Sequence, residues 1–249
     1  MSRSTDALSA DREALIGMCD TLDSEGWARP SGCQGWSVKD VVSHMGALYW
    51  AVVDPSTLPD TAGVGTEEAQ EMLVVSRRSM SAEQVLEDYA TVSEKAIGIL
   101  DTFDGVDVDI PLGDLGTYPV SVLPTAFCFD HFTHIRADLF APRGPFDLPA
   151  PPADELRVMP TLEWIDVALR QQNRAVLDGF GGAADIVVTG AGGKTIRVGN
   201  PGAEATAVVV SDAETCVRWI TKRARWDEIG VETSGDRETL TVLQSLKVF

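Results

Sequence analysis

Residues 119–140 form a run that is apolar on two faces of the helix that its spacing predicts. A helix that is apolar on two sides is buried by its neighbours, so its polar members need partners inside the protein. Asp130 and His134 share one of these faces, and because they are four residues apart they point in the same direction. The pattern therefore predicts a helical bundle with a carboxylate and an imidazole in its interior.

The chain has three histidines, and His44 lies outside this run, in a second predicted helix. Ser37 with Asp40 three residues later forms a capping box, which signals the start of a helix. Asp54 followed by Pro55 ends that helix. Because His44 falls on the apolar face between these two signals, we expect its ring to point into the protein.

Two imidazoles and one carboxylate from separate helices are typical of an open zinc site, which keeps one position for water or substrate. A metal would also neutralise the buried charge of Asp130. The sequence therefore predicts a metal centre formed by His44, Asp130 and His134. The same pattern allows another interpretation, in which His44 is a hydrogen-bonded core histidine and Asp130 pairs with Arg136 or a backbone N–H.

Three further residues bear on this site. His131 is a competing ligand, but it lies about 100° around the helix from Asp130 and leaves the face that holds His134, so it ranks below Asp130. Asp138 lies one turn beyond His134 and is expected to accept a hydrogen bond from its ring N–H. Cys33 belongs to a loop near the site, and a structural role is favoured over a reactive one.

The net charge is −18, from 20 basic and 38 acidic side chains among 249 residues. Phosphate groups and anionic membranes attract the opposite sign, so we expect neither nucleic acid nor membrane partners. The sequence contains no apolar run of about 18 residues and no basic leader segment. Its four cysteines form no C-x-x-C pair, so a zinc ribbon or a redox motif is not supported. A cytoplasmic protein with reduced thiols is expected.

The apolar residues have helical spacing in the first part of the chain, and strand-like runs appear only in the last part, so two domains are predicted. The predicted fold class is α plus α+β. Residues 1–155 are expected to form an up-and-down four-helix bundle, and 156–249 a small α+β domain that includes its lead-in helix. The proline-rich segment 142–160 marks the boundary. The other elements expected are helices at 5–24, 67–79, 81–103, 161–177, 211–223 and 237–246, and strands at 185–189, 194–198, 205–210 and 229–233.

Residues 27–44, which read WARPSGCQGWSVKDVVSH, resemble the N-terminal signature of the mycothiol-dependent maleylpyruvate isomerase family. Members of that family are DinB-like metal-binding four-helix bundles. The later family motif, a glutamate followed at intervals of four by a histidine and an aspartate, corresponds to Asp130, His134 and Asp138. The segment from Val210 onward resembles the small C-terminal domain of the family, which is related to sterol carrier proteins.

The resemblance implies that His44, Asp130 and His134 bind one divalent metal, usually zinc. It also implies that this metal activates the thiol of mycothiol, and that an arginine of the C-terminal domain, best matched by Arg223, binds an anion near the site. The chain departs from the family at Asp130, which stands where glutamate is usual. Aspartate is one methylene shorter and reaches less far from the same backbone.

Together these features predict a zinc-dependent isomerase or S-transferase that activates mycothiol for addition to a small electrophile. Arg223 would hold a carboxylate of the substrate or of the thiol. The departure at Asp130 keeps one alternative open, a non-catalytic metal- or ligand-binding or regulatory module. Another alternative is a metal-dependent hydrolase, in which the open position of the metal holds water instead of thiol. The sequence leaves the substrate, the metal identity and the oligomeric state open.

Overall fold

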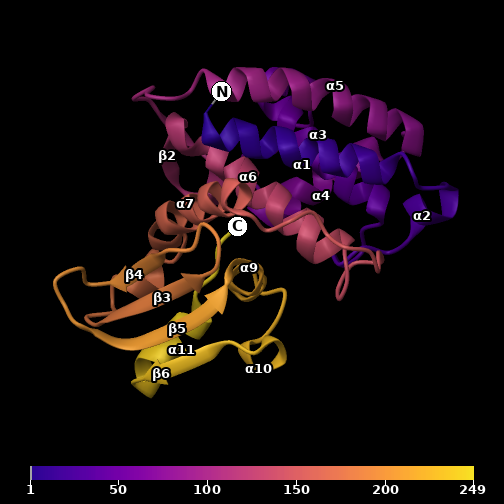
Figure 1. Cartoon of the computed structure of the whole chain (residues 1–249). Coiled ribbons are helices and arrows are strands. Elements are labelled where there is room, and N and C mark those ends of the chain that lie inside the picture. The colour runs from indigo at the N-terminus through magenta and orange to yellow at the C-terminus, as the bar shows by residue number, and fades with distance from the viewer. Residues whose placement is uncertain (1) are drawn as a thin grey trace. The chain divides into compact units, whose positions relative to one another are not determined.

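The computed structural model describes residues 2–249, and it divides into two compact units (Figure 1). The first unit ends at Pro152, and the second comprises Ala153–Phe249. The boundary predicted from sequence, 155, falls on the first residue of helix α7 (Glu155–Gln172). The lead-in helix of the predicted second domain thus lies wholly in the second unit.

Four helices build the first unit: α1 (Arg3–Cys19), α3 (Val38–Val53), α5 (Ala82–Asp101) and α6 (Leu123–Thr133). Figure 1 shows them side by side, with α3 packed along α5, and α1 packed against both α5 and α6. The predicted capping box at Ser37 is present, and the predicted helix start at 81 has a capping box as well, because each serine hydroxyl accepts from a backbone N–H three residues later. The predicted helical architecture of this region is therefore confirmed. Its largest fully buried side chains include Leu8, Leu15, Met45, Tyr49, Tyr89, Leu100, Phe132, Ile135 and Leu139.

Shorter elements connect these helices. The first helix ends at Cys19, before the predicted 24, and a separate α2 (Ser24–Ala28) follows, capped by Asp23. The segment 104–118, predicted as a loop, contains a small antiparallel hairpin of β1 (Asp109–Pro111) and β2 (Thr117–Pro119). The other connecting elements are α4 (Thr66–Arg77) and the 3-10 turns η1 (Pro55–Thr57), η2 (Gly113–Leu115) and η3 (Val120–Val122).

The helix predicted at 119–140 is not continuous. The α-helical part, α6, begins only at Leu123, with Pro124 in its first turn, where the missing N–H leaves no hydrogen bond unmade. After Thr133 the chain widens into a π-helix, η4 (His134–Leu139), and at its end the Phe140 N–H donates to the carbonyl of Ile135, five residues earlier. Such π turns inside α-helices often occur at functional sites.

The second unit packs a four-stranded sheet against helices. The strands β3 (Ala183–Thr189), β4 (Thr195–Gly199), β5 (Ala205–Asp212) and β6 (Glu232–Gly235) lie in the order β4-β3-β5-β6. The β3–β5 pair is parallel and the other pairs are antiparallel. This arrangement confirms the predicted α+β class. The helices that follow α7 are α8 (Arg174–Leu177), α9 (Ala213–Ile220), α10 (Trp226–Ile229) and α11 (Arg237–Ser245).

Several boundaries in the second unit differ from the prediction, and three of the differences have a clear cause. Helix α7 starts at Glu155 instead of Thr161, because Asp154 caps it and Pro160 is accommodated within it. Strand β5 continues through Asp212, which caps α9, so this helix begins at Ala213 and not at the predicted 211. The last strand begins at Glu232, because residues 226–229 form the short helix α10.

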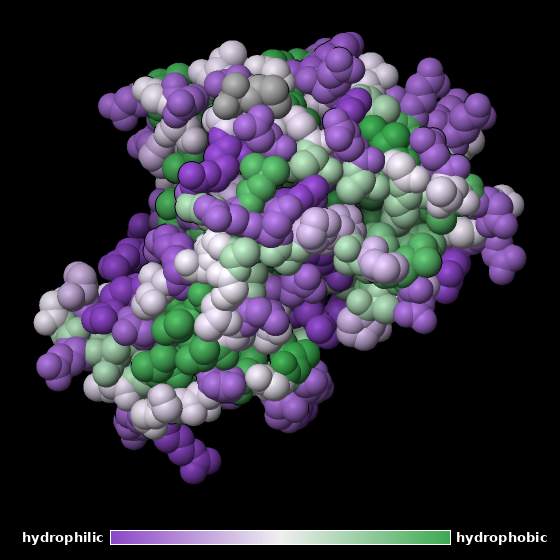
Figure 2. Space-filling model, viewed as in Figure 1, coloured by the Kyte–Doolittle hydropathy of each residue, from purple (hydrophilic) through white to green (hydrophobic). Residues whose placement is uncertain are grey.

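The sheet of the second unit has one well-covered face. Helices α9 and α11 pack against β3 and β5. Val208 and Val210 of β5 alternate with buried residues and are themselves only half-buried. Figure 2 shows apolar residues gathered over the strands of this sheet. Within residues 2–249, no helix combines the length and apolar character needed to cross a bilayer.

Candidate metal centre

His44, Asp130 and His134 come together inside the first unit. His44 lies on α3 and is 3% exposed, and its Nε2 is 3.2 Å from Oδ1 of Asp130. His134 Nε2 is 3.5 Å from the same oxygen. One donor atom from each residue lies within 4.8 Å of the other two. The structure therefore places in one cluster the three side chains that the sequence singled out.

The spacing of these donor atoms suits a tetrahedral metal. Zinc bonds of about 2.0–2.2 Å to nitrogen and oxygen place neighbouring tetrahedral donors about 3.3–3.6 Å apart. The two distances to Asp130 Oδ1, 3.2 and 3.5 Å, agree with that spacing. In addition, Oδ2 of Asp130 is buried without a hydrogen-bond partner among the residues described. The donor set and the unpartnered oxygen both fit a bound divalent cation.

The charges of the cluster are strongly coupled. Burial alone would raise the pKa of Asp130, but His134 and His44 outweigh it and hold that pKa well below its ordinary value. Burial alone would lower the pKa of His134, but Asp130, Cys33 and the hydrogen bond to Asp138 raise it well above the ordinary value. A carboxylate that stays ionised beside imidazoles is the state that a metal cation requires.

The second ring nitrogen of His134 is held by Asp138. Its Nδ1 lies 2.9 Å from Asp138 Oδ2, which confirms the predicted contact. Because a carboxylate only accepts, Nδ1 carries a proton, and Nε2, on the side of Asp130, is the nitrogen that offers a lone pair once the ring is neutral. The backbone carbonyl of Asp138 accepts from the Gly32 N–H at 2.7 Å, and Arg143 lies 3.6 Å from its carboxylate.

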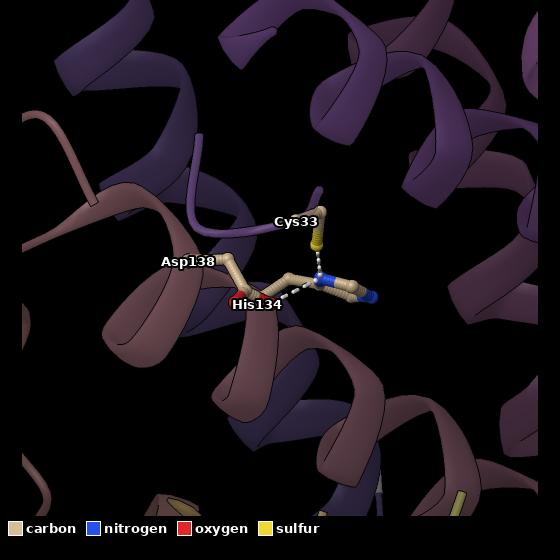
Figure 3. A group of neighbouring side chains, drawn as sticks. All are labelled: Cys33, His134 and Asp138. Atoms are coloured by element: carbon tan, nitrogen blue, oxygen red, sulfur yellow. Dashed lines mark hydrogen bonds and ion pairs between the residues drawn. The ribbon is translucent and has the colours of Figure 1, made fainter. Parts of the chain in front are cut away.

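Cys33 also contacts His134, which the sequence did not predict. Its half-buried Sγ lies 3.6 Å from His134 Nδ1. Figure 3 shows Cys33 and Asp138 converging on this nitrogen while the other ring nitrogen points away from both. Cys33, His134 and Asp138 thus form a second group of donor atoms within 4.8 Å, on the opposite edge of the shared imidazole. Docking of the loop through Gly32 creates this group, and no local sequence signal marks it.

Trp36 forms one wall of the cluster. Its ring centroid lies 5.2 Å from that of His44 and 6.5 Å from that of His134. The indole N–H donates to Glu71 at 2.6 Å, which fixes the ring. The same capping segment that starts α3 therefore also covers both imidazoles with an apolar surface.

Two of the alternatives for these residues are not supported by the geometry. Arg136 pairs with Asp11, at 3.0 Å, and not with Asp130. His131 is fully buried, its Nδ1 faces the carbonyl of Phe127 at 3.0 Å, and burial lowers its pKa. It belongs to neither donor group found among residues 2–249.

Residues 8–134, about half of the chain, match the sequence profile of a family described as the mycothiol maleylpyruvate isomerase N-terminal domain. The chain belongs to this family. The matched range contains His44 and Asp130 and ends at His134. The family resemblance expected from residues 27–44 is therefore confirmed.

Two solved structures share the fold. The mycothiol-dependent maleylpyruvate isomerase aligns with a TM-score of 0.58 at 12% identity, covering 95% of each chain. A histidine-to-alanine variant of the mycothiol-dependent maleylpyruvate isomerase aligns with a TM-score of 0.55 at the same identity and coverage. No curated protein matches the chain in sequence. At this identity the likeness establishes the fold, including the α+β second unit of the family.

Arg223, the anion-binding residue expected from the family resemblance, lies in the second unit, just after α9. Its backbone N–H donates to the carbonyl of Arg218 at 2.8 Å. The preceding residue, Lys222, has a positive φ of 62°, so the chain turns sharply at this point. Its role toward a substrate stays a prediction.

Gly32 should be essential for the arrangement around His134. A Cβ at this position would lie 2.8 Å from Cα and 2.9 Å from Oδ1 of Asp138, closer than real Cβ atoms approach. Gly32→Ala is therefore expected to displace the loop and weaken zinc binding about tenfold or more, as losses of groups behind metal ligands do. Chelator competition measures this. Gly98→Ala, where nothing lies within 4 Å of the added atom, is the matched control. Equal affinities of the two variants would contradict the prediction.

Proposed function

We propose that this chain is a metal-dependent enzyme, with zinc as the expected metal, that uses mycothiol as a co-substrate. The reaction proposed is isomerisation or S-transfer on a small electrophile. The observation that carries the proposal is the convergence of two imidazoles on one carboxylate oxygen, at 3.2 and 3.5 Å. Membership of the mycothiol maleylpyruvate isomerase family supports the choice of thiol.

The residues of the cluster have separate roles in this proposal. His44 and His134 offer neutral nitrogen donors, and Asp130 offsets part of the cation's charge. Asp138 holds the ring of His134 with Nε2 toward the cation's position. A divalent metal bound here supplies the positive charge that stabilises a thiolate near neutral pH. The side chain of Asp130 is 19% exposed, so solvent reaches this ligand of the cluster.

The chemistry proposed is reversible addition of the thiol sulfur to an electron-poor carbon. In isomerisation a carbon–sulfur bond forms, the adjacent carbon–carbon bond rotates, and the carbon–sulfur bond breaks to return the thiol. In S-transfer the carbon–sulfur bond is kept and the thiol proton passes to the substrate. We propose that Arg223 binds a carboxylate of the substrate or of mycothiol in a bidentate contact.

An assay of thiol consumption and of cis–trans conversion tests this function. Zinc-loaded and chelator-treated protein are compared over a panel of small electrophiles that includes maleylpyruvate, each with mycothiol, with another thiol, and without thiol. The proposal expects conversion that requires both metal and mycothiol. A protein that binds zinc but converts no member of the panel would instead be a non-catalytic metal-binding module. Metal-dependent hydrolysis without thiol would favour the hydrolase.

Zinc affinity should rise with pH. Asp130 and its neighbours raise the pKa of His134 well above the ordinary histidine value of about 6.5, so a proton must leave its ring before a metal binds. The folding stability of the metal-free protein should change with pH in the opposite direction and fall as pH rises. The raised pKa stabilises the fold below about pH 6.5, and this contribution is lost as pH rises through the raised value. Calorimetry in buffers of different ionisation enthalpy measures the protons released. An affinity that does not change above pH 6.5 would contradict the prediction.

A further inference from the structure

Several polar atoms in the first unit are buried without a hydrogen-bond partner among the described residues, and four of them belong to residues that lie close together. They are the hydroxyls of Tyr49 and Tyr89, Nε2 of His131 and Oδ2 of Asp130. The first three residues are each 0% exposed. Buried polar groups in proteins are almost always paired, and leaving one unpaired is costly. Unpaired polar atoms on neighbouring residues therefore indicate that a small polar molecule binds between them.

The three rings meet at one place, although each comes from a different helix. The ring centroids of His131 and Tyr49 are 5.0 Å apart, those of His131 and Tyr89 6.1 Å, and those of the two tyrosines 5.9 Å. The helices are α3 for Tyr49, α5 for Tyr89 and α6 for His131. A molecule held between them would satisfy three groups at once.

The contacts of His131 fix which of its nitrogens carries a proton. Nδ1 lies 3.0 Å from the carbonyl oxygen of Phe127, and a carbonyl can only accept, so Nδ1 is the donor. The same nitrogen is 3.5 Å from Oδ2 of Asp130. In the neutral ring Nε2 is then an acceptor, and the rings of two tyrosines, whose hydroxyls can donate, lie beside the His131 ring.

We propose that one ordered water molecule lies between Tyr49, Tyr89 and His131, and that it fixes the His131 ring with Nδ1–H on the Phe127 carbonyl and its positive edge 3.5 Å from Asp130 Oδ2. The water donates to Nε2 of His131 and exchanges hydrogen bonds with the two hydroxyls, within the two to four bonds that a buried water makes. His131 is then a positioning residue for Asp130. This last step rests on the proposed metal centre, whereas the water site itself does not.

A crystal structure of the metal-free protein at high resolution, together with ¹⁵N spectra of its three histidine rings, tests the water site. Density for one water between the three side chains is expected, with His131 protonated on Nδ1 and hydrogen-bonded at Nε2. In a Tyr49→Phe, Tyr89→Phe double variant, the water density should disappear and the Nε2 resonance should shift. Tyr118→Phe is the matched control, because that buried hydroxyl donates elsewhere, to the Leu115 carbonyl. A direct tyrosine–histidine hydrogen bond, or a proton on Nε2 alone, would overturn the proposal.

Zinc affinity tests the positioning role. His131→Leu should weaken binding about 10- to 100-fold, the range for groups that hold metal ligands in place. His131→Asn should recover most of that loss, because its amide N–H can take the place of Nδ1–H. Equal affinities of the two variants would reject positioning. If the wild-type protein binds no metal, the proposed metal centre and the positioning role both fail, and the density and the ring spectra still decide the water site.

Discussion

His134→Ala should reduce zinc affinity by at least about 100-fold, since losing a group behind a ligand already costs 10- to 100-fold. His134 is the residue that both donor groups share, and its Nε2 lies 3.5 Å from Asp130 Oδ1. Without the ring, one neutral donor is lost and the Asp130 carboxylate loses a main cause of its lowered pKa. Isothermal titration of metal-free protein with zinc measures the loss, and activity with mycothiol should fall with it.

His44→Ala and Cys33→Ser separate the two donor groups around His134. The first should lose binding as His134→Ala does, because His44 Nε2 is 3.2 Å from Asp130. The second should keep wild-type affinity, because Cys33 lies on the Nδ1 edge of the ring. The opposite pattern would place the metal between Cys33 and Asp138.

Arg136→Leu should destabilise the first unit by about 3–5 kcal/mol, the cost of leaving a buried charge without its partner. The side chains of Arg136 and Asp11 are 2% and 4% exposed, with Nη2 3.0 Å from Oδ1. The guanidinium also lies over the ring of Phe132 at 4.2 Å and donates to the carbonyl of Pro152 at 3.1 Å. Urea denaturation of the metal-free protein gives the change in unfolding free energy.

A double variant shows whether the Arg136–Asp11 pair stabilises the first unit through its charges or through its packing. Replacing both partners, as in Asp11→Leu with Arg136→Leu, removes the unpaired charge and should cost less than Arg136→Leu alone. A double variant that is as unstable as the sum of the two single variants would mean that the pair contributes through packing only. In that case the ion pair would not explain the stability of this end of the bundle.

Signals confined to one or two helical turns predicted much of the first unit. The capping box of Ser37 depends on residues three apart and is formed, and the helix expected from residue 81 is capped by Ser81 in the same way. The four-residue spacing of Asp130 and His134 placed both side chains in one cluster, because α6 is regular up to Thr133. His44 was placed by the apolar face of its own helix, and its ring is buried as expected.

Long-range contacts explain what the sequence did not predict. The π-helix from His134 onward has no local signal, and it contains Asp138, on which the Gly32 loop docks. Cys33 reaches His134 only through that docking, across more than a hundred residues of chain. Asp11, the partner of Arg136, lies on a different helix, α1 and not η4, so no spacing within one helix predicts this pair. Contacts of this kind depend on how helices pack and not on spacing within one helix.

X-ray absorption at the zinc edge of the zinc-loaded protein tests the proposed centre most directly. Two imidazoles and an oxygen donor, with no sulfur, are expected before any thiol is added, because His44, Asp130 and His134 are the donor group that faces His134 Nε2. A sulfur signal should appear only when mycothiol is supplied. Sulfur in the thiol-free protein, or fewer than two imidazoles, would contradict the account, because the metal would then lie beside Cys33 and Asp138.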